Sequence, residues 1–134
     1  MSDPVFADTY YYVALLSQRD AAHQRAVDVS RRLTGTVVTS AWVIQELADG
    51  LCQPPARLGF AKFLDALRAD AHTLLVGPDA GIWWRAIDLY RARPDKAWSL
   101  TDGTSFVIMS DRALTQALTA DHHFEQAGFV ALLK

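Results

Sequence analysis

Hydrophobic positions follow two different periods along the chain. Short runs rich in β-branched residues, such as Val37 and Val38 between two threonines, are typical of strands. Longer segments carry apolar residues at every third or fourth position, as at Ala22, Ala26 and Val29, which indicates helices. Strands and helices alternate over the whole length, and this order predicts an α/β domain with a mostly parallel sheet.

Turn and capping residues set the expected bounds of these elements. Gly35 ends one helix, Ser40 and Ser99 are placed to cap two others, and Pro54 opens another. We expect strands at residues 4–7, 36–39, 72–76, 116–120 and 129–133, and helices at 10–16, 20–33, 41–52, 54–67, 79–90, 100–110 and 123–127. No repeat or linker interrupts the pattern, so residues 1–134 are expected to form a single domain.

Four acids stand out against this pattern. Asp8 ends the first predicted strand, and Asp121 follows the fourth. Asp102 lies in the first turn of an apolar helix, and Glu46 lies within a helix, beside its apolar arc. Because functional residues of a parallel sheet collect beyond the carboxyl ends of its strands, we expect all four carboxylates at one edge.

Each acid alone also has a structural explanation. Ser99 and Asp102 match the S-x-x-[DE] capping box, in which the acid accepts a hydrogen bond from the backbone of the cap residue. Asp8 and Asp121 are natural N-caps, and Glu46 fits a solvated helix flank. For a single acid these explanations compete with a functional one.

The four acids together favour a metal site. Carboxylates gathered at one edge repel one another unless a cation neutralises them, and oxygen-only ligand sets suit Mg²⁺ or Mn²⁺ rather than zinc. The chemistry of such a site is hydrolysis of a phosphodiester by a metal-activated water, which needs no serine or cysteine nucleophile. Thr9, Thr101 and Ser105 are nearby hydroxyls that can position a phosphate or a water, or serve only the fold.

Charge and cysteine content narrow the possible partners and compartment. A net charge of −2 gives no general attraction to nucleic acid, so binding must come from a local basic patch. Arg91, Arg93 and Lys96 form such a cluster and are our candidates for substrate backbone contacts, although a solvated helix end also explains them. The lone Cys52, together with no signal peptide or membrane-spanning run, indicates a cytoplasmic protein with no membrane partner.

Four sequence blocks resemble one family. They are F-A-D-T with Asp8, V-I-Q-E-L with Glu46, R-P-D-K-A-W-S-L-T-D-G-T-S-F with Asp102, and L-T-A-D-H-H-F-E-Q-A-G-F with Asp121. In their order and spacing the chain resembles the PIN-domain ribonucleases, and most closely the VapC-type toxins of bacterial and archaeal toxin–antitoxin pairs. The last two blocks are the specific ones, and the resemblance covers nearly the whole chain.

This resemblance implies a three-layer α/β/α fold around a five-stranded parallel sheet. It implies a Mg²⁺- or Mn²⁺-dependent endonuclease that cuts single-stranded or looped RNA at the four acids. It also implies a homodimer and a small antitoxin partner whose C-terminal segment covers the acidic site. The turn Met109-Ser110-Asp111-Arg112 departs from the family, because many relatives are more basic there.

Other functions stay open at this point. A non-catalytic PIN-like module binding RNA or protein, and a DNA-directed nuclease, use the same fold. Asp121-His122-His123 spells the D-H-H motif of another phosphoesterase family, but the further motifs of that family are missing. Trp83 and Trp84 are compatible with base stacking and fit the core or a dimer interface better, because adjacent helical residues point about 100° apart.

Overall fold

A parallel sheet of five strands forms the centre of the computed structural model, which describes residues 2–134. The strand order is β3-β2-β1-β4-β5, and every pairing is parallel. The strands are β1 (Val5–Ala7), β2 (Val37–Ser40), β3 (Thr73–Val76), β4 (Gln116–Leu118) and β5 (Val130–Ala131). The expected five-stranded α/β architecture is confirmed, and the sheet is parallel throughout.

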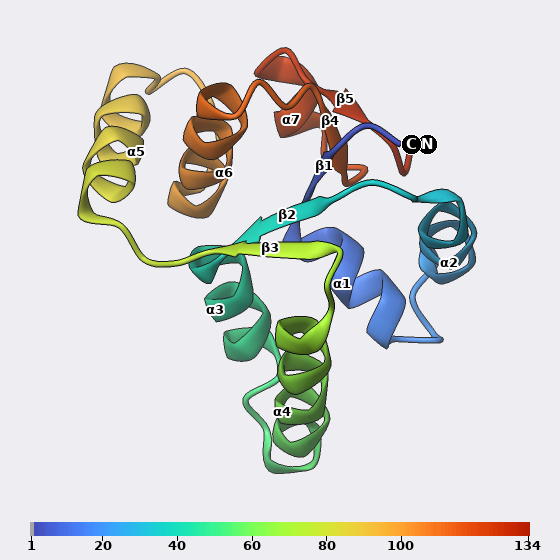
Figure 1. The fold of residues 1–134 in the computed structure, drawn as a ribbon. Helices are drawn as coiled ribbons and strands as arrows, with labels where there is room; N and C mark the ends of the chain where they lie inside the picture. Colours follow the sequence, from blue (N-terminus) through green and yellow to red (C-terminus); the bar gives the residue numbers. More distant parts are fainter. Residues whose placement is uncertain (1) are drawn as a thin grey trace.

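Seven helices connect the strands and cover both sides of the sheet. They are α1 (Thr9–Leu16), α2 (His23–Arg32), α3 (Ala41–Gly50), α4 (Pro54–Ala69), α5 (Ala80–Ala92), α6 (Leu100–Asp111) and α7 (His122–Gln126). In Figure 1, α3 and α4 lie below β2 and β3, and α5 and α6 lie above them. Within residues 2–134, none of the helices combines the length and apolar character needed to cross a bilayer.

Most expected bounds differ from the observed ones by one or two residues, and the start of α2 differs by three. Helix α2 begins at His23 rather than at Asp20, because the Asp20 carboxylate accepts a hydrogen bond from Ala22 N at 2.8 Å and holds a turn there. Strand β4 ends at Leu118, because Thr119 N turns back to the carbonyl of Ala117 at 3.0 Å. Strand β5 spans only Val130–Ala131, and the expected run 129–133 was too long.

Helix α6 is the most deeply placed helix, and it carries one of the four acids. Every residue from Asp102 to Met109 is buried. Gly103 permits close contact with α5, because a Cβ at that position would lie 3.3 Å from the carbonyl oxygen of Ala86. Phe106 packs edge-on against Trp98 and Phe124, with ring centroids 5.1 and 5.0 Å away. This packing fixes the start of α6 relative to α5 and α7.

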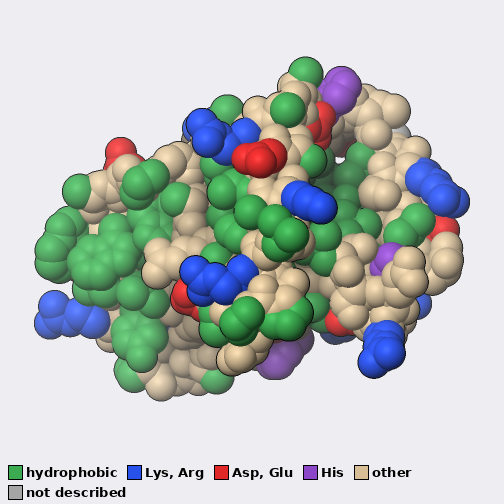
Figure 2. All heavy atoms as spheres, turned by 90° about the horizontal axis from the view of Figure 1, so that it is seen from below, with side chains coloured by type: hydrophobic (Ala, Val, Ile, Leu, Met, Phe, Trp, Pro, Cys, Tyr) green, Lys and Arg blue, Asp and Glu red, His purple; other side chains and the backbone are tan. Residues whose placement is uncertain are grey.

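Helix α5 exposes two large aromatic side chains. Trp84 is 59% exposed and Tyr90 is 56% exposed. Figure 2 shows hydrophobic side chains gathered on the left, the side on which α5 lies in Figure 1. Trp83 is partly buried while Trp84 is exposed, so the two tryptophans do point to different surroundings, as expected from their spacing.

Candidate functional site

Asp8 lies at the carboxyl end of β1, in the centre of the sheet. It occupies the N-cap position of α1, but its side chain makes no capping hydrogen bond. Instead its Oδ2 accepts a hydrogen bond from Thr119 Oγ1 at 2.9 Å. The side chain is buried, and this burial raises the pKa of Asp8 to about 7, with the charges of Asp102 and Glu46 adding to the rise and the Thr119 hydrogen bond opposing it.

Asp102 is held by the capping box that its sequence predicts. Asp102 N donates to Ser99 Oγ at 3.0 Å, and Ser99 N donates to Asp102 Oδ2 at 3.1 Å. Nδ1 of His123 lies 3.0 Å from the same carboxylate oxygen. Burial, together with the charge of Asp121, raises the pKa of Asp102, while the hydrogen bonds from Ser99 and His123 work against the rise.

Asp121 caps α7 and faces Asp102. Its Oδ1 accepts a hydrogen bond from His123 N at 2.9 Å, and its own backbone N donates to Thr119 Oγ1 at 3.0 Å. One ligand atom from each of Asp121, His122 and His123 falls within 4.8 Å of the others. The capping function expected for Asp121 is confirmed, and it places the carboxylate beside the other acids.

Glu46 approaches from a different element. It lies in the middle of α3, which Ser40 caps by accepting a hydrogen bond from Val43 N at 3.2 Å. The Glu46 side chain is exposed and near enough to Asp8 for its charge to help raise the pKa of that carboxyl. The acid therefore has no capping function, and the fold brings it to the same edge.

One pocket of about 390 Å³ collects all four acids. Asp8, Glu46, Asp102 and Asp121 line it, and so do the remaining members Thr9, Tyr10, Val13, Asp20, Ser99 and His123. Among the described residues that line it there is no lysine or arginine. The pocket is thus an acidic site without a cationic side chain to balance it. We call it the acidic pocket.

The hydroxyl candidates divide between this pocket and the core. Thr9 lines the acidic pocket, and its buried Oγ1 has no hydrogen-bond partner. Ser105 Oγ is also buried without a partner, but Ser105 is not among the residues that line the pocket. Thr101 faces a neighbouring pocket, which also touches Glu46 and Trp83. Only Thr9 therefore combines an unpaired hydroxyl with a place at the acids.

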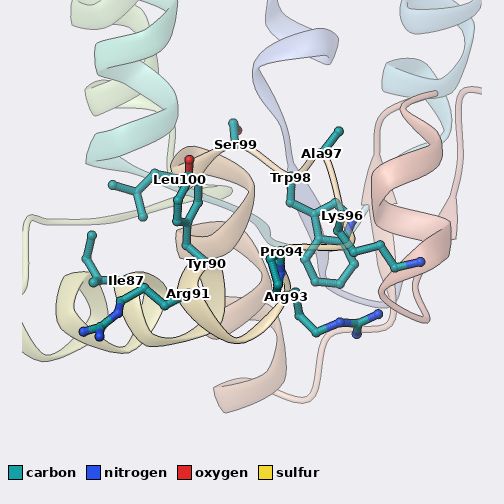
Figure 3. A pocket seen from close by; sticks show the side chains of 10 residues that line it. All are labelled: Ile87, Tyr90, Arg91, Arg93, Pro94, Lys96, Ala97, Trp98, Ser99 and Leu100. Atoms are coloured by element: carbon teal, nitrogen blue, oxygen red, sulfur yellow. The ribbon is translucent and has the colours of Figure 1, made fainter.

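The basic candidates lie outside the acidic pocket. Arg91, Arg93 and Lys96 line a larger cavity of about 790 Å³ between the end of α5 and the start of α6. Figure 3 shows these three side chains reaching outward at the edges of that cavity. Ser99 lines both cavities, so the basic one is a direct neighbour of the acidic pocket.

A family model for the PIN domain matches residues 5–130 of this chain. The chain belongs to the PIN-domain family. Nucleases of this family use divalent metal ions, and the acidic pocket is where this PIN domain gathers carboxylate oxygens. The family resemblance of the four sequence blocks is thereby confirmed.

Known proteins resemble this chain in sequence and in structure. This PIN domain is 27% identical over 129 residues to the 23S rRNA-specific endonuclease VapC20 of Mycobacterium tuberculosis, an alignment that covers 94% of this chain and 95% of that protein. The crystal structure of VapC20, described as a sarcin–ricin loop cleaving toxin, matches with a TM-score of 0.82 at 26% identity over 94% of this chain and 96% of that chain. FitAcB from Neisseria gonorrhoeae matches with a TM-score of 0.69 at 20% identity over 95% of this chain and 94% of that chain, which shows the shared fold.

Two residues that contact or neighbour the acids were not identified from the sequence. Thr119 was an ordinary strand residue in the L-T-A-D block, yet its hydroxyl connects Asp8 to the backbone of Asp121. Asp20 was interpreted as a helix start, yet it lines the acidic pocket. A threonine two residues before a capping acid is only a weak sign that the threonine positions a site. The sign becomes specific when the neighbouring strand is known to end in a second acid.

Proposed function

We propose that this PIN domain is a Mg²⁺- or Mn²⁺-dependent endoribonuclease. Asp8, Glu46, Asp102 and Asp121 are its catalytic and metal-binding residues in this proposal. The observation that carries it is the convergence of these acids, from β1, α3, α6 and α7, on one pocket that no described lysine or arginine lines. The similarity to VapC20, which is named as a 23S rRNA-specific endonuclease, supports RNA as the substrate.

The residues of the pocket fit a hard divalent cation. Asp8 and Asp102 are only 6% and 7% exposed, so their negative charges cost stability unless a cation neutralises them. Carboxylate oxygens are the ligands preferred by Mg²⁺ and Mn²⁺. Thr9 lines the same pocket, and its buried Oγ1 has no hydrogen-bond partner within the chain. His123 offers the pocket an imidazole, which here is engaged with Asp102.

The chain itself supplies position and charge. A bound divalent cation supplies an activated water and neutralises charge that develops on the scissile phosphate. The capping box holds Asp102, and the cap of α7 holds Asp121, so neither carboxylate has to be ordered when substrate arrives. Because the pKa of Asp8 is about 7, its proton must leave before the carboxylate can act as a ligand.

Assembly and substrate contacts complete the proposal. We infer that residues 1–134 form a single PIN domain, because the family model covers residues 5–130. We infer further that the protein is a cytoplasmic toxin, that it forms a homodimer, and that a separate antitoxin chain covers the acidic pocket. In this proposal Arg91, Arg93 and Lys96 contact the substrate backbone and Thr9 is the supporting hydroxyl, whereas Ser105 is fully buried in α6 and does not line the acidic pocket. Co-expression with the product of the adjacent reading frame, followed by co-purification, tests the antitoxin.

The test of the activity is parallel digestion of matched RNA and DNA strands. The purified protein is incubated with each strand in Mg²⁺, in Mn²⁺ and in a chelator. We expect internal cuts in RNA with either metal and none with the chelator. Cuts confined to DNA overturn the choice of substrate. The absence of cuts in both strands, with no stabilisation of the fold by the metals, supports the non-catalytic binding module instead.

A further inference from the structure

The larger cavity beside the acidic pocket combines apolar walls with positive charge. Its walls are Ile87 and Tyr90 of α5, Pro94 and Trp98 of the connecting loop, and Leu100 at the start of α6. Figure 3 shows Tyr90 and Leu100 on one side and Pro94 and Trp98 on the other. We call it the basic pocket. Its volume of about 790 Å³ is within the usual range of small-molecule sites.

Of the two aromatic rings in this pocket, only Tyr90 is open to a ligand. Trp98 is 8% exposed, its Nε1 donates to Gln126 Oε1 at 3.0 Å, and its ring packs edge-on against Phe106. The guanidinium of Arg93 covers the Trp98 ring at 5.2 Å from its centroid. Tyr90 by contrast is 56% exposed. Trp98 is therefore a fixed wall, while Tyr90 presents a free ring face.

The three cations of the pocket differ in the same way. Arg93 is engaged, since its Nε and Nη2 donate to the carboxylate of Asp95 at 3.0 and 2.9 Å. The side chains of Arg91 and Lys96 make no hydrogen bond or ion pair with any residue in 2–134. Arg91 and Lys96 therefore place two positive charges at opposite edges of the basic pocket, and the charge of Lys96 also helps to lower the pKa of Asp95. The net charge of the chain is −2, so this local concentration of positive side chains is not a general property of the surface.

From this arrangement we propose that the basic pocket is a nucleotide subsite of the RNA-cleaving centre. An unpaired base stacks on Tyr90, and Arg91 and Lys96, at the two edges of the pocket, hold phosphates of the same strand. Aromatic faces that stack bases next to cations that track the backbone are how proteins bind single strands. The inference rests on the proposed function, because it takes the acidic pocket as the place where the strand is cut.

The position of the subsite follows from the wall that the two pockets share. Ser99 lines both pockets, and its backbone N holds Asp102. A strand whose scissile phosphate lies at the acids therefore has the basic pocket as its next neighbour on that side. An A-form duplex cannot place one base in a side pocket, so the subsite selects single-stranded or looped RNA.

The experiment measures binding of a short single-stranded RNA in a chelator, where no cleavage occurs. Tyr90→Ala is expected to raise the dissociation constant by about 5- to 150-fold, the range that stacking of one base supplies. Tyr90→Phe keeps the ring and is expected to bind like the parent. Lys96→Ala is expected to reduce the slope of log affinity against log salt by about 0.7, the contribution of one phosphate on a single strand. Lys62→Ala, which removes an exposed lysine of α4 outside the pocket, is the matched control.

A series of oligonucleotides with one abasic position each locates the stacked base. At one position, removal of the base is expected to lower the RNA affinity of the parent. At the same position it is expected to leave the RNA affinity of Tyr90→Ala unchanged. Equal abasic losses for both proteins at every position overturn the proposal. A change of oligomeric state in solution for Tyr90→Ala, with unchanged RNA affinity, also overturns the proposal. The pocket is then a contact between two copies of the chain. If Tyr90→Ala binds RNA as tightly as the parent, and the parent cuts RNA in the presence of metal, the subsite proposal is wrong. The proposed function is then unaffected.

Discussion

The hydroxyl of Thr119 donates a hydrogen bond to the carboxylate of Asp8 at 2.9 Å, between residues 111 positions apart in the chain. The same Oγ1 accepts the backbone N–H of Asp121 at 3.0 Å. A single fully buried side chain at the end of β4 thus fixes one acid directly and positions the backbone of another. The spacing of Asp8 and Asp121 depends on this residue.

Replacing Thr119 by valine tests this connection. The substitution nearly keeps the volume, but it leaves Asp121 N unpaired and removes the hydrogen bond that lowers the pKa of Asp8. We expect Mn²⁺ affinity, measured by calorimetric titration at pH 7, to fall about 10- to 100-fold, as when a group that orients metal ligands is removed. Thr119→Ser keeps the hydroxyl and should stay close to the parent. Equal Mn²⁺ affinities for the valine and serine variants contradict this role.

The pKa of Asp8 predicts how stability changes with pH in the absence of metal. The pKa is about 7 in the folded protein and 3.8 ordinarily, so the unfolded chain loses this proton first as the pH rises. This carboxyl therefore destabilises the fold progressively from about pH 4 to pH 7, by up to about 4 kcal/mol. Asp8→Asn removes the effect, so in a chelator it should be more stable than the parent at pH 8, with the difference disappearing near pH 4.

Urea unfolding of both proteins at a series of pH values checks this prediction. The difference between parent and variant is the relevant quantity, because the other titrating groups are common to both. A difference in the free energy of unfolding that does not change between pH 4 and pH 8 contradicts a raised pKa at Asp8. Addition of Mn²⁺ at pH 8 should stabilise the parent and leave Asp8→Asn nearly unchanged.

The capping box allows the structural and the metal-binding roles of Asp102 to be separated. In Asp102→Asn the side-chain oxygen still accepts the hydrogen bond from Ser99 N, so the free energy of unfolding should change by less than about 1 kcal/mol. The increase in Tm caused by Mn²⁺ should disappear. Ser99→Ala should do the opposite, losing about 1 kcal/mol of stability with the cap while keeping the Mn²⁺ effect. Thermal melting with and without Mn²⁺ distinguishes them, and an intact Mn²⁺ effect in Asp102→Asn contradicts its assignment as a ligand.

Much of the fold and the four acids could be predicted because their signals are local. The capping box is contained within four residues, and the strand that ends at Asp8 is defined by its own apolar run. A parallel sheet then brings strand ends to one edge, whatever the lengths of the connections. The caps expected at Asp102 and Asp121 are confirmed, and they are compatible with the proposed metal-binding role, because a cap fixes a carboxylate in place.

The rest depends on contacts that no local pattern contains. Thr119 becomes important only because β1 and β4 are neighbours, a pairing that joins the beginning and end of the chain. The position of Asp20 at the acidic pocket could not be predicted, because a turn held by its carboxylate has the same sequence signal as the start of a helix. The sequence does not distinguish Arg91 from Arg93, since both are arginines near the end of the same helix. Only the structure shows that Arg93 is paired with Asp95 and that Arg91 is not.

The most direct test of the central claim is the rate at which Asp8→Asn cuts RNA in Mn²⁺. The control is Asp88→Asn, which removes an exposed acid of α5 that does not line the acidic pocket. With both variants folded as the parent is, the account predicts that Asp88→Asn cuts at the parental rate. It predicts that Asp8→Asn is slower by at least about 100-fold, because several kcal/mol of transition-state stabilisation depend on a correctly held cation. An Asp8→Asn protein that cuts RNA as fast as Asp88→Asn contradicts the account.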